Sequence, residues 1–509
     1  MPVTDASAGS VLGDQVRSGA LWSAGSTLFL RFANIAIMAI VARIVAPEAF
    51  GVFALAMVAH GVVVSLAELG ISSALLRNDL DPDRIAPTIA TVSIVTSFVL
   101  GAAMAVFADP LAAALGSPDA AAPLRVMALS VALIGPFVVP GALIQREFRQ
   151  DVLFRAAAIA FVPSSAVLLL VALAGDGALA FAWSRVAAQL VTGVILTLKV
   201  NRRYRPGFRR DQIGMLVRFG LPLALANLLS QALLNVDYIF VGRTLGVEAT
   251  GLYSLAFTIA GWSTAVIGSV LNGIVQPAFS RVRHEGGDLR GALLSACRTV
   301  ALVACVIGAL TLALAEPLLS TIYGTQWTGA APALAVLAVY GVLFVLCLLL
   351  ANIIISTGRT GGLLLVQVVA LAVLLPAMAV GVRYGDLVGV GLAHILVTAG
   401  VTLPLYLFMV RRTIQRPFGV LVRAVAWPVS AAALAGGTAW AVAMLVPTAP
   451  AKFLLGGLAG GILYLVLTAQ LLLPLVPPAL RGSRTFGRLL VGLAWPSSWL
   501  VRHVDRGRA

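Results

Sequence analysis

Long apolar stretches separated by short polar segments follow one another along almost the whole chain. A helix crosses the hydrocarbon core of a bilayer in about 20 residues, and only helices or closed barrels satisfy every backbone polar group there. Apolar runs of this length, broken by glycine, proline or charge, predict an all-α polytopic membrane protein with about 14 transmembrane helices. They cover approximately residues 18–41, 50–70, 86–108, 124–143, 154–174, 178–200, 215–241, 251–279, 293–315, 334–355, 362–382, 388–410, 420–446 and 453–476.

The positive charges predict the orientation of these spans. Of the 35 Lys and Arg residues, 28 fall on the inner side, five on the outer side, and two, Arg31 and Arg185, lie well inside spans. Loops on the cytoplasmic side of a membrane carry an excess of Lys and Arg. We therefore expect a multi-pass protein of the cytoplasmic (inner) membrane with both termini in the cytoplasm.

The composition agrees with this picture. Hydrophobic residues make up 60% of the chain and charged residues 11%, against about 25% charged in soluble domains, which excludes a soluble globular protein. The inner loops account for the net charge of +15 without a nucleic-acid partner. Seven cations between Lys199 and Arg218 serve to set the topology; attraction of anionic lipid headgroups is the alternative.

An internal repeat divides the chain. At an offset of 200, residues 41–56 match residues 241–256 at seven of sixteen positions, including Arg43/Arg243 and Gly51/Gly251. The repeat unit is six helices, an even number, so the two copies run in the same direction and are related by an axis along the membrane normal. Two helices follow the second repeat at the C-terminus.

The repeat and the spans predict five regions. They are a cytoplasmic N-terminal segment (1–17), an N-lobe (18–210), a C-lobe (211–416), two further spans (417–478) and a basic amphipathic cytoplasmic tail (479–509).

Two spans carry polar stripes at membrane depth. Arg31 and Asn34 lie on one face of span one, and Asn227, Gln231 and Asn235 recur every four residues along span seven. An arginine in mid-membrane costs a few kcal/mol, about 3 on insertion scales, unless it faces a wet cavity or a partner. The stripes therefore indicate a substrate cavity, with a buried arginine–carboxylate pair as the structural alternative.

Further polar residues extend the candidate site. Span six contributes Arg185 and Gln189, with Thr192 on the same face, and span eight contributes Asn272. Groups within spans that are able to exchange a proton or bind a cation, and so to couple transport to an ion gradient, are Asp237, Glu68 and His60. For Asp237, an ion pair with Arg243 that shapes the outer turn is an equally good interpretation.

Enzyme signatures are missing from the sequence. It contains neither GxxxxGK[ST] nor HExxH, its four histidines are dispersed, and its three cysteines lie in apolar stretches without CxxC spacing. We therefore expect a transporter rather than an enzyme, with no metal and no cofactor.

The repeated segments also resemble a known family. The stretch ALWSAGSTLFLRFANIAIMAIVARIVAPEAFGVFALA with LAELGISSALLR resembles the start of Wzx-type polysaccharide flippases of the WzxC-like branch. The stretch LVRFGLPLALANLLSQALLNVDYIFVGRTLGVEATGLYSLA resembles their second half, and NIIISTGRTG resembles their loop after span ten.

This resemblance implies a transporter of the multidrug/oligosaccharidyl-lipid/polysaccharide superfamily. Such proteins move polyprenyl-diphosphate-linked oligosaccharides outward by alternating access, for exopolysaccharide, capsule or O-antigen (lipopolysaccharide) synthesis. Their spans one, two, seven and eight line a central, often cationic cavity. The implied partners are the lipid-linked oligosaccharide, membrane lipids and other polysaccharide-assembly proteins.

Other functions compete with this expectation. A drug/cation antiporter of the same superfamily usually has twelve spans and a carboxylate site, whereas arginines lead the candidate residues here. A membrane-embedded polysaccharide polymerase or glycosyltransferase needs a sizeable extramembrane loop, and every predicted outer loop is short. A scaffold without transport activity is a third alternative, which a flipping assay distinguishes.

The topology is directly testable. Single cysteines introduced after Pro118 and after Tyr323 should react with an impermeant thiol reagent from outside the cell. A cysteine at Arg205 should react only after permeabilisation, because its loop belongs to the basic inner side. Reversed labelling at any of these sites would mean that a span has been miscounted.

Overall fold

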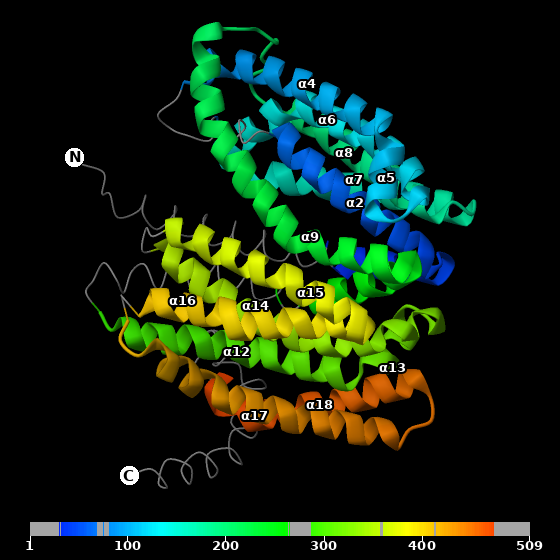
Figure 1. Ribbon diagram of the computed structural model, residues 1–509, viewed down its shortest axis with the longest axis vertical. Coiled ribbons are helices and arrows are strands. Elements are labelled where there is room, and N and C mark those ends of the chain that lie inside the picture. Colours follow the sequence, from blue (N-terminus) through cyan, green and yellow to red (C-terminus); the bar gives the residue numbers. More distant parts are fainter. Residues whose placement is uncertain are drawn as a thin grey trace, which may run out of the picture. The chain divides into compact units, whose positions relative to one another are not determined.

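The computed structural model describes residues 30, 32–68, 75, 81–262, 264, 287–356, 360–411 and 414–472, and Figure 1 shows the helices that these residues form. In chain order the first group is the helix Phe32–Ile44, α2 (Pro47–Glu68), α4 (Pro82–Val106), α5 (Ala108–Leu115), η1 (Pro118–Ala120), α6 (Ala121–Arg146), α7 (Gln150–Leu173), α8 (Gly177–Lys199) and α9 (Arg210–Ala260).

The second group begins after residue 286. It consists of α12 (Leu289–Ala313), α13 (Ala315–Ile322), η3 (Thr325–Ala330), α14 (Ala331–Ser356), α15 (Thr360–Val397), η4 (Thr398–Thr402), α16 (Leu403–Val410), α17 (Pro417–Met444) and α18 (Ala449–Leu472). The helical path of α15 is interrupted at Gly385 and Asp386, between the predicted spans eleven and twelve.

The predicted fold class is confirmed. Within the described residues, ten helices are long and apolar enough to cross a membrane, and one of them, Gly361–Val410, covers two predicted spans. The described part of each predicted span is helical apart from a few terminal residues. The chain is therefore an all-α polytopic membrane protein.

The two repeats share their order of elements. In each, a long helix (α4 or α12) is followed by a short helix (α5 or α13), a 3₁₀ turn (η1 or η3) and another long helix (α6 or α14). Even the caps correspond, because Asp81 accepts the backbone N–H of Asp83 and Asp288 accepts that of Arg290, each at 3.0 Å. These side chains satisfy N–H groups that the first turn of a helix leaves unpaired.

The proline-containing fourth span forms one continuous helix. Pro136 has no N–H to donate, so the Ala132 carbonyl oxygen lacks its usual helical donor. The Ser97 hydroxyl of α4 lies 3.4 Å from that oxygen and accepts the backbone N–H of Gly135 at 3.1 Å. Polar side chains of a neighbouring helix commonly satisfy the backbone near a membrane proline. The close contact also needs the glycine, since a Cβ at residue 135 would lie 2.2 Å from the Ser97 Oγ.

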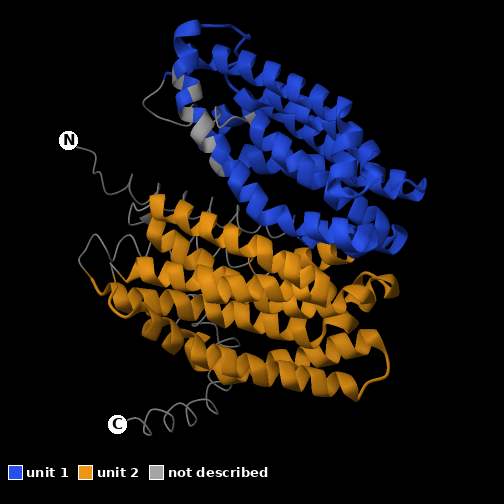
Figure 2. Cartoon of the chain, in the orientation of Figure 1, with its two compact units in different colours: residues 1–251 blue, residues 252–509 orange. Residues whose placement is uncertain are grey.

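The chain divides into two compact units, Met1–Gly251 and Leu252–Ala509 (Figure 2). The first part of α9 therefore packs with the first unit, and the lobe boundary expected at residue 210 from the repeat stays a prediction. In the second unit, α18 packs closely on α17. A Cβ at Gly456 would lie 2.7 Å from the Ala439 carbonyl oxygen, and one at Gly460 would lie 2.7 Å from that of Ala435.

Helices α2 and α9 cross within the first unit, and a matched glycine from each repeat lies at the crossing. A Cβ added at Gly51 would lie 1.8 Å from the carbonyl oxygen of Val247, and one added at Gly251 would lie 1.8 Å from that of Pro47. The four residues correspond at the offset of 200, so the crossing is itself nearly two-fold symmetric. The chain reaches it through Gly246, whose φ of 87° and ψ of −177° suit only glycine.

This close crossing predicts that adding one methyl group at either glycine lowers the stability of the protein. Gly51→Ala and Gly251→Ala should each destabilise the protein by about 1–3 kcal/mol or more, because the added Cβ must push two backbones apart. The measurement is the apparent melting temperature in detergent. Gly437→Ala in α17 is the matched control, since a Cβ there meets nothing within 4 Å, and equal melting of all three variants would contradict the crossing.

Candidate functional site

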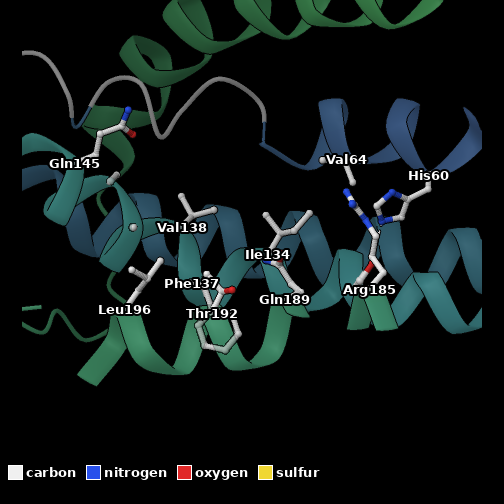
Figure 3. A pocket seen from close by; sticks show the side chains of 14 residues that line it. His60, Val64, Ile134, Phe137, Val138, Gln145, Arg185, Gln189, Thr192 and Leu196 are labelled. Carbon is white, nitrogen blue, oxygen red and sulfur yellow. Dashed lines mark hydrogen bonds between the residues drawn. The ribbon is translucent and has the colours of Figure 1, made fainter. Parts of the chain in front are cut away.

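A polar cavity of about 330 Å³ lies in the first unit between α2, α6 and α8 (Figure 3). Its polar lining residues are His60, Ser130, Gln145, Arg185, Gln189 and Thr192. It follows α6 from Ser130 to Gln145, which at the rise of an α-helix is about 22 Å. The cavity therefore connects mid-membrane positions with the end of α6 that the topology predicts to be cytoplasmic.

Helical spacing directs the α8 residues to one wall. Arg185, Gln189 and Thr192 follow one another at four and three residues, so they share a face of the helix. Gly193 comes next and lets the Phe137 ring of α6 approach, since a Cβ there would lie 2.0 Å from Cδ2 of that ring. One wall thus combines a cation, an amide and a hydroxyl with an aromatic ring opposite.

The buried His60 has a defined hydrogen-bond partner. Its Nε2 lies 2.9 Å from the Ser130 Oγ, and this hydroxyl donates to the Met127 carbonyl oxygen at 2.7 Å. A hydroxyl has one proton, so it accepts at the other contact, and Nε2 of His60 carries hydrogen and donates. In the neutral ring, Nδ1 is then left as an acceptor.

Arg185 is the most unusual residue of the cavity. It lies eight residues, or about 12 Å, from the start of α8 and is exposed to the cavity. Within the part of the chain that the structure describes, it makes no ion pair or hydrogen bond. Figure 3 shows it at the same end of the cavity as His60. Its guanidinium offers five N–H donors to an anionic group.

The corresponding helices of the second unit are packed differently. There the part of α9 after its kink, α14 and α15 bring aromatic rings together. The ring of Tyr340 lies 4.6 Å from that of His394, and Phe257 lies 5.9 Å from the same histidine. Aromatic rings thus lie between these helices of the second unit, whereas polar side chains line the cavity of the first.

The cavity unites four of the residues expected from the sequence: Arg185, Gln189, Thr192 and His60. A fifth, Gln231, packs on α2 next to His60, because a Cβ at Gly61 would lie 2.6 Å from its Nε2. Sequence reasoning missed Ser130 and Gln145, because a single serine within a span and a single glutamine just beyond its end carry no signal of their own.

The other candidate residues do not line this cavity. Asn34 is exposed and donates to the Leu30 carbonyl oxygen at 2.8 Å, and Asn235 donates to that of Gln231, also at 2.8 Å. Asp237 is buried, and its Oδ1 accepts the backbone N–H of Tyr238 at 3.0 Å. Asn227 is half-buried on α9. Arg31, Asn272 and the side chain of Glu68 lie outside the described residues.

Comparison with known proteins identifies the family. A family of proteins described as "polysaccharide biosynthesis protein" matches residues 40–332, more than half of the chain. The chain belongs to this family. The match includes both matching segments of the internal repeat, residues 41–56 and 241–256, and the whole of the cavity, from His60 to Leu196.

Individual members of the family cover most of the chain. The succinoglycan biosynthesis transport protein ExoT of Rhizobium meliloti is 28% identical over 399 residues, which are 77% of this chain and 78% of ExoT. The lipopolysaccharide biosynthesis protein WzxC of Escherichia coli is 22% identical over 410 residues, which are 79% of this chain and 82% of WzxC. The resemblance to WzxC-like proteins is thus confirmed.

A solved structure has the same fold. The lipid II flippase MurJ, in an inward closed conformation, superposes with a TM-score of 0.70 at 12% sequence identity, covering 90% of this chain and 100% of MurJ. At this identity the likeness concerns the fold alone. The chain therefore shares the fold of MurJ over 90% of its length.

The contacts in the cavity predict that one substitution lowers the stability of the protein and that another leaves it nearly unchanged. Ser130→Ala removes the acceptor of the His60 Nε2–H and should cost about 1–3 kcal/mol of stability, because a buried donor is left unpaired. Arg185→Gln should change stability by no more than about 0.5 kcal/mol, because no described partner is lost. Apparent melting temperatures in detergent measure both. Strong destabilisation by Arg185→Gln would show that the arginine has a structural partner.

Proposed function

We propose that this protein flips polyprenyl-diphosphate-linked oligosaccharides outward across the cytoplasmic membrane, by alternating access, for the synthesis of a cell-surface polysaccharide. The family supports the pathway, and the names of ExoT as a transport protein and of WzxC as a lipopolysaccharide biosynthesis protein support the role. The fold shared with MurJ, itself named a flippase, is compatible with it.

The observation that carries the proposal is the cavity around Arg185. A cation without a described partner in mid-membrane is stable only where water or an anion reaches it. A diphosphate supplies such an anion, and the planar guanidinium can bind two of its oxygens at once. The amide of Gln189 and the hydroxyl of Thr192 can exchange hydrogen bonds with sugar hydroxyls.

In this arrangement the polar and apolar parts of the substrate occupy different environments. The diphosphate and sugars occupy the polar cavity, whereas the polyprenyl chain stays in the hydrocarbon and pays no desolvation cost. Further substrate contacts, outside this cavity, are proposed for Arg31, Asn34, Asn227, Gln231, Asn235 and Asn272. The short apolar wall around Ile134, Phe137 and Val138 offers a surface for the flat faces of sugar rings.

Gradient coupling is proposed to use a titratable group near the substrate. Asp237, Glu68 and His60 remain the candidates, and His60 is the one that lines the cavity with Arg185. Both termini are proposed to be cytoplasmic, as the distribution of Lys and Arg predicts. Other polysaccharide-assembly proteins are proposed as partners at the outer surface, where the flipped unit is used.

A reconstituted flipping assay tests the proposal. Purified protein in liposomes should move a fluorescent polyprenyl-diphosphate sugar between leaflets, and Arg185→Gln should lower the initial rate at least about tenfold, since a charged hydrogen bond contributes about 1.5–3 kcal/mol. Arg185→Lys should retain part of the rate, because it keeps the charge and loses the planar fork.

The control is Arg125→Gln, which removes an exposed arginine that pairs with Asp109, outside the cavity. The Arg125→Gln variant should move the lipid-linked sugar at the wild-type rate. If the wild-type protein moves no lipid-linked sugar, the proposed function is wrong. If Arg185→Gln flips as fast as wild type, the function stands and the substrate site lies elsewhere.

A further inference from the structure

The loop between α8 and α9, residues 200–209, is basic and yet held against α4 by hydrogen bonds. It joins the ends of two membrane helices and carries Arg202, Arg203, Arg205 and Arg209, with Arg210 opening α9. A stretch of like charges normally repels itself and stays extended in solvent. Here it is instead bound to the first turns of α4.

The first anchor is Asp83 in the opening turn of α4. The Arg202 Nη1 donates to both carboxylate oxygens of Asp83, at 2.9 and 2.7 Å, and the Tyr204 hydroxyl donates to the same carboxylate. Partial burial, together with the Asp83 hydrogen bond, raises the pKa of the Tyr204 hydroxyl, so it remains a donor at neutral pH. One carboxylate therefore holds two loop residues.

The second anchor is formed with the backbone. Gly207 donates its N–H to the Pro87 carbonyl oxygen at 3.1 Å, and the Thr91 hydroxyl donates to the Gly207 carbonyl oxygen at 2.7 Å. Just beyond the loop, the Gln212 Nε2 donates to the Arg84 carbonyl oxygen at 3.1 Å. The loop is thus attached to α4 along two turns of that helix.

These anchors leave a cationic surface free. Arg203, Arg205, Arg209 and Arg210 are exposed, and they make no ion pair with any residue that the structure describes. Phe208 stands among them with 58% of its side chain exposed. Arginines grouped around an exposed aromatic ring are typical of surfaces that meet the headgroup layer of a membrane.

We propose that this loop binds the anionic headgroups of phospholipids in the cytoplasmic leaflet. Phosphatidylglycerol is the type of lipid that we expect it to bind. The arginines supply charge-assisted hydrogen bonds to the phosphodiester, and Phe208 enters the acyl boundary. The loop lies at this depth because membrane helices begin and end on either side of it. The inference concerns the protein's lipid environment and does not depend on which substrate is transported.

Order is what distinguishes a lipid site from a topology signal. Lys and Arg fix the orientation of a membrane protein during insertion by their number alone, in whatever conformation the loop has. A binding site instead gains affinity when its donors are already held in place, since less side-chain and loop entropy is lost on binding. Release of the anchors without removal of any cation therefore separates the two roles.

The first experiment removes charge. The full chain in neutral detergent is titrated with dioleoyl phosphatidylglycerol or dioleoyl phosphatidylcholine, and bound lipid is counted by native mass spectrometry. The triple variant Arg203→Gln, Arg205→Gln, Arg209→Gln should lose about 100-fold in phosphatidylglycerol affinity, since each cation contributes about fivefold near an anionic surface. The phosphatidylcholine titration should not change.

A matched control removes three exposed arginines elsewhere on the predicted inner side: Arg290→Gln, Arg416→Gln and Arg423→Gln. Their loss should leave phosphatidylglycerol affinity within about twofold of wild type. Equal losses in the two triple variants would overturn the proposal, because they would show attraction by net charge alone.

The second experiment releases the loop. Asp83→Asn makes the protein more positive while it breaks the anchor of Arg202 and weakens that of Tyr204. An ordered site predicts a fall in phosphatidylglycerol affinity of about fivefold, whereas attraction by charge alone predicts a rise. Tyr204→Phe removes only one anchor and keeps every charge, so it gives the same test if Asp83→Asn is poorly produced. Unchanged or increased affinity in these variants would overturn the proposal.

Discussion

The hydrocarbon core requires every backbone donor and acceptor to be paired within the protein, and the rest of the structure follows from that requirement. It makes every described element helical, and it explains why a membrane helix with two internal prolines needs the Ser97 hydroxyl beside it. The same requirement gives meaning to polar side chains. Those that do not pair with their own helix must find a neighbour, as His60 finds Ser130, or face a cavity, as Arg185 does.

Duplication supplied two similar scaffolds, and the two have diverged in what they enclose. The order of helices and the capping aspartates Asp81 and Asp288 are shared. The side chains between the corresponding helices differ, with a polar cavity in the first unit and a group of tilted aromatic rings around His394 in the second. The two copies therefore share the order of their helices but not the polarity of the residues between them.

Arginine has three physical roles in this chain. Most arginines lie in loops that the sequence predicts to be cytoplasmic, where their number would orient the helices. Arg202 is an anchor, because its partner Asp83 fixes a loop. Arg185 faces the cavity, and the exposed arginines around Phe208 make no ion pair with a described residue. Both are the places where we propose that an anion binds.

The sequence by itself determined the spans, the fold class, the repeat and the family, because these depend on hydrophobic length, charge counts and matching residues along the chain. It also placed Arg185, Gln189 and Thr192 on one helical face. Only the tertiary structure decided that this face meets His60 and Ser130, that Asn34 and Asn235 bond to their own helices, and that α6 continues through its prolines. Helical periodicity fixes the direction of a side chain relative to its own axis, but which neighbouring helix it meets depends on packing between segments far apart in the chain.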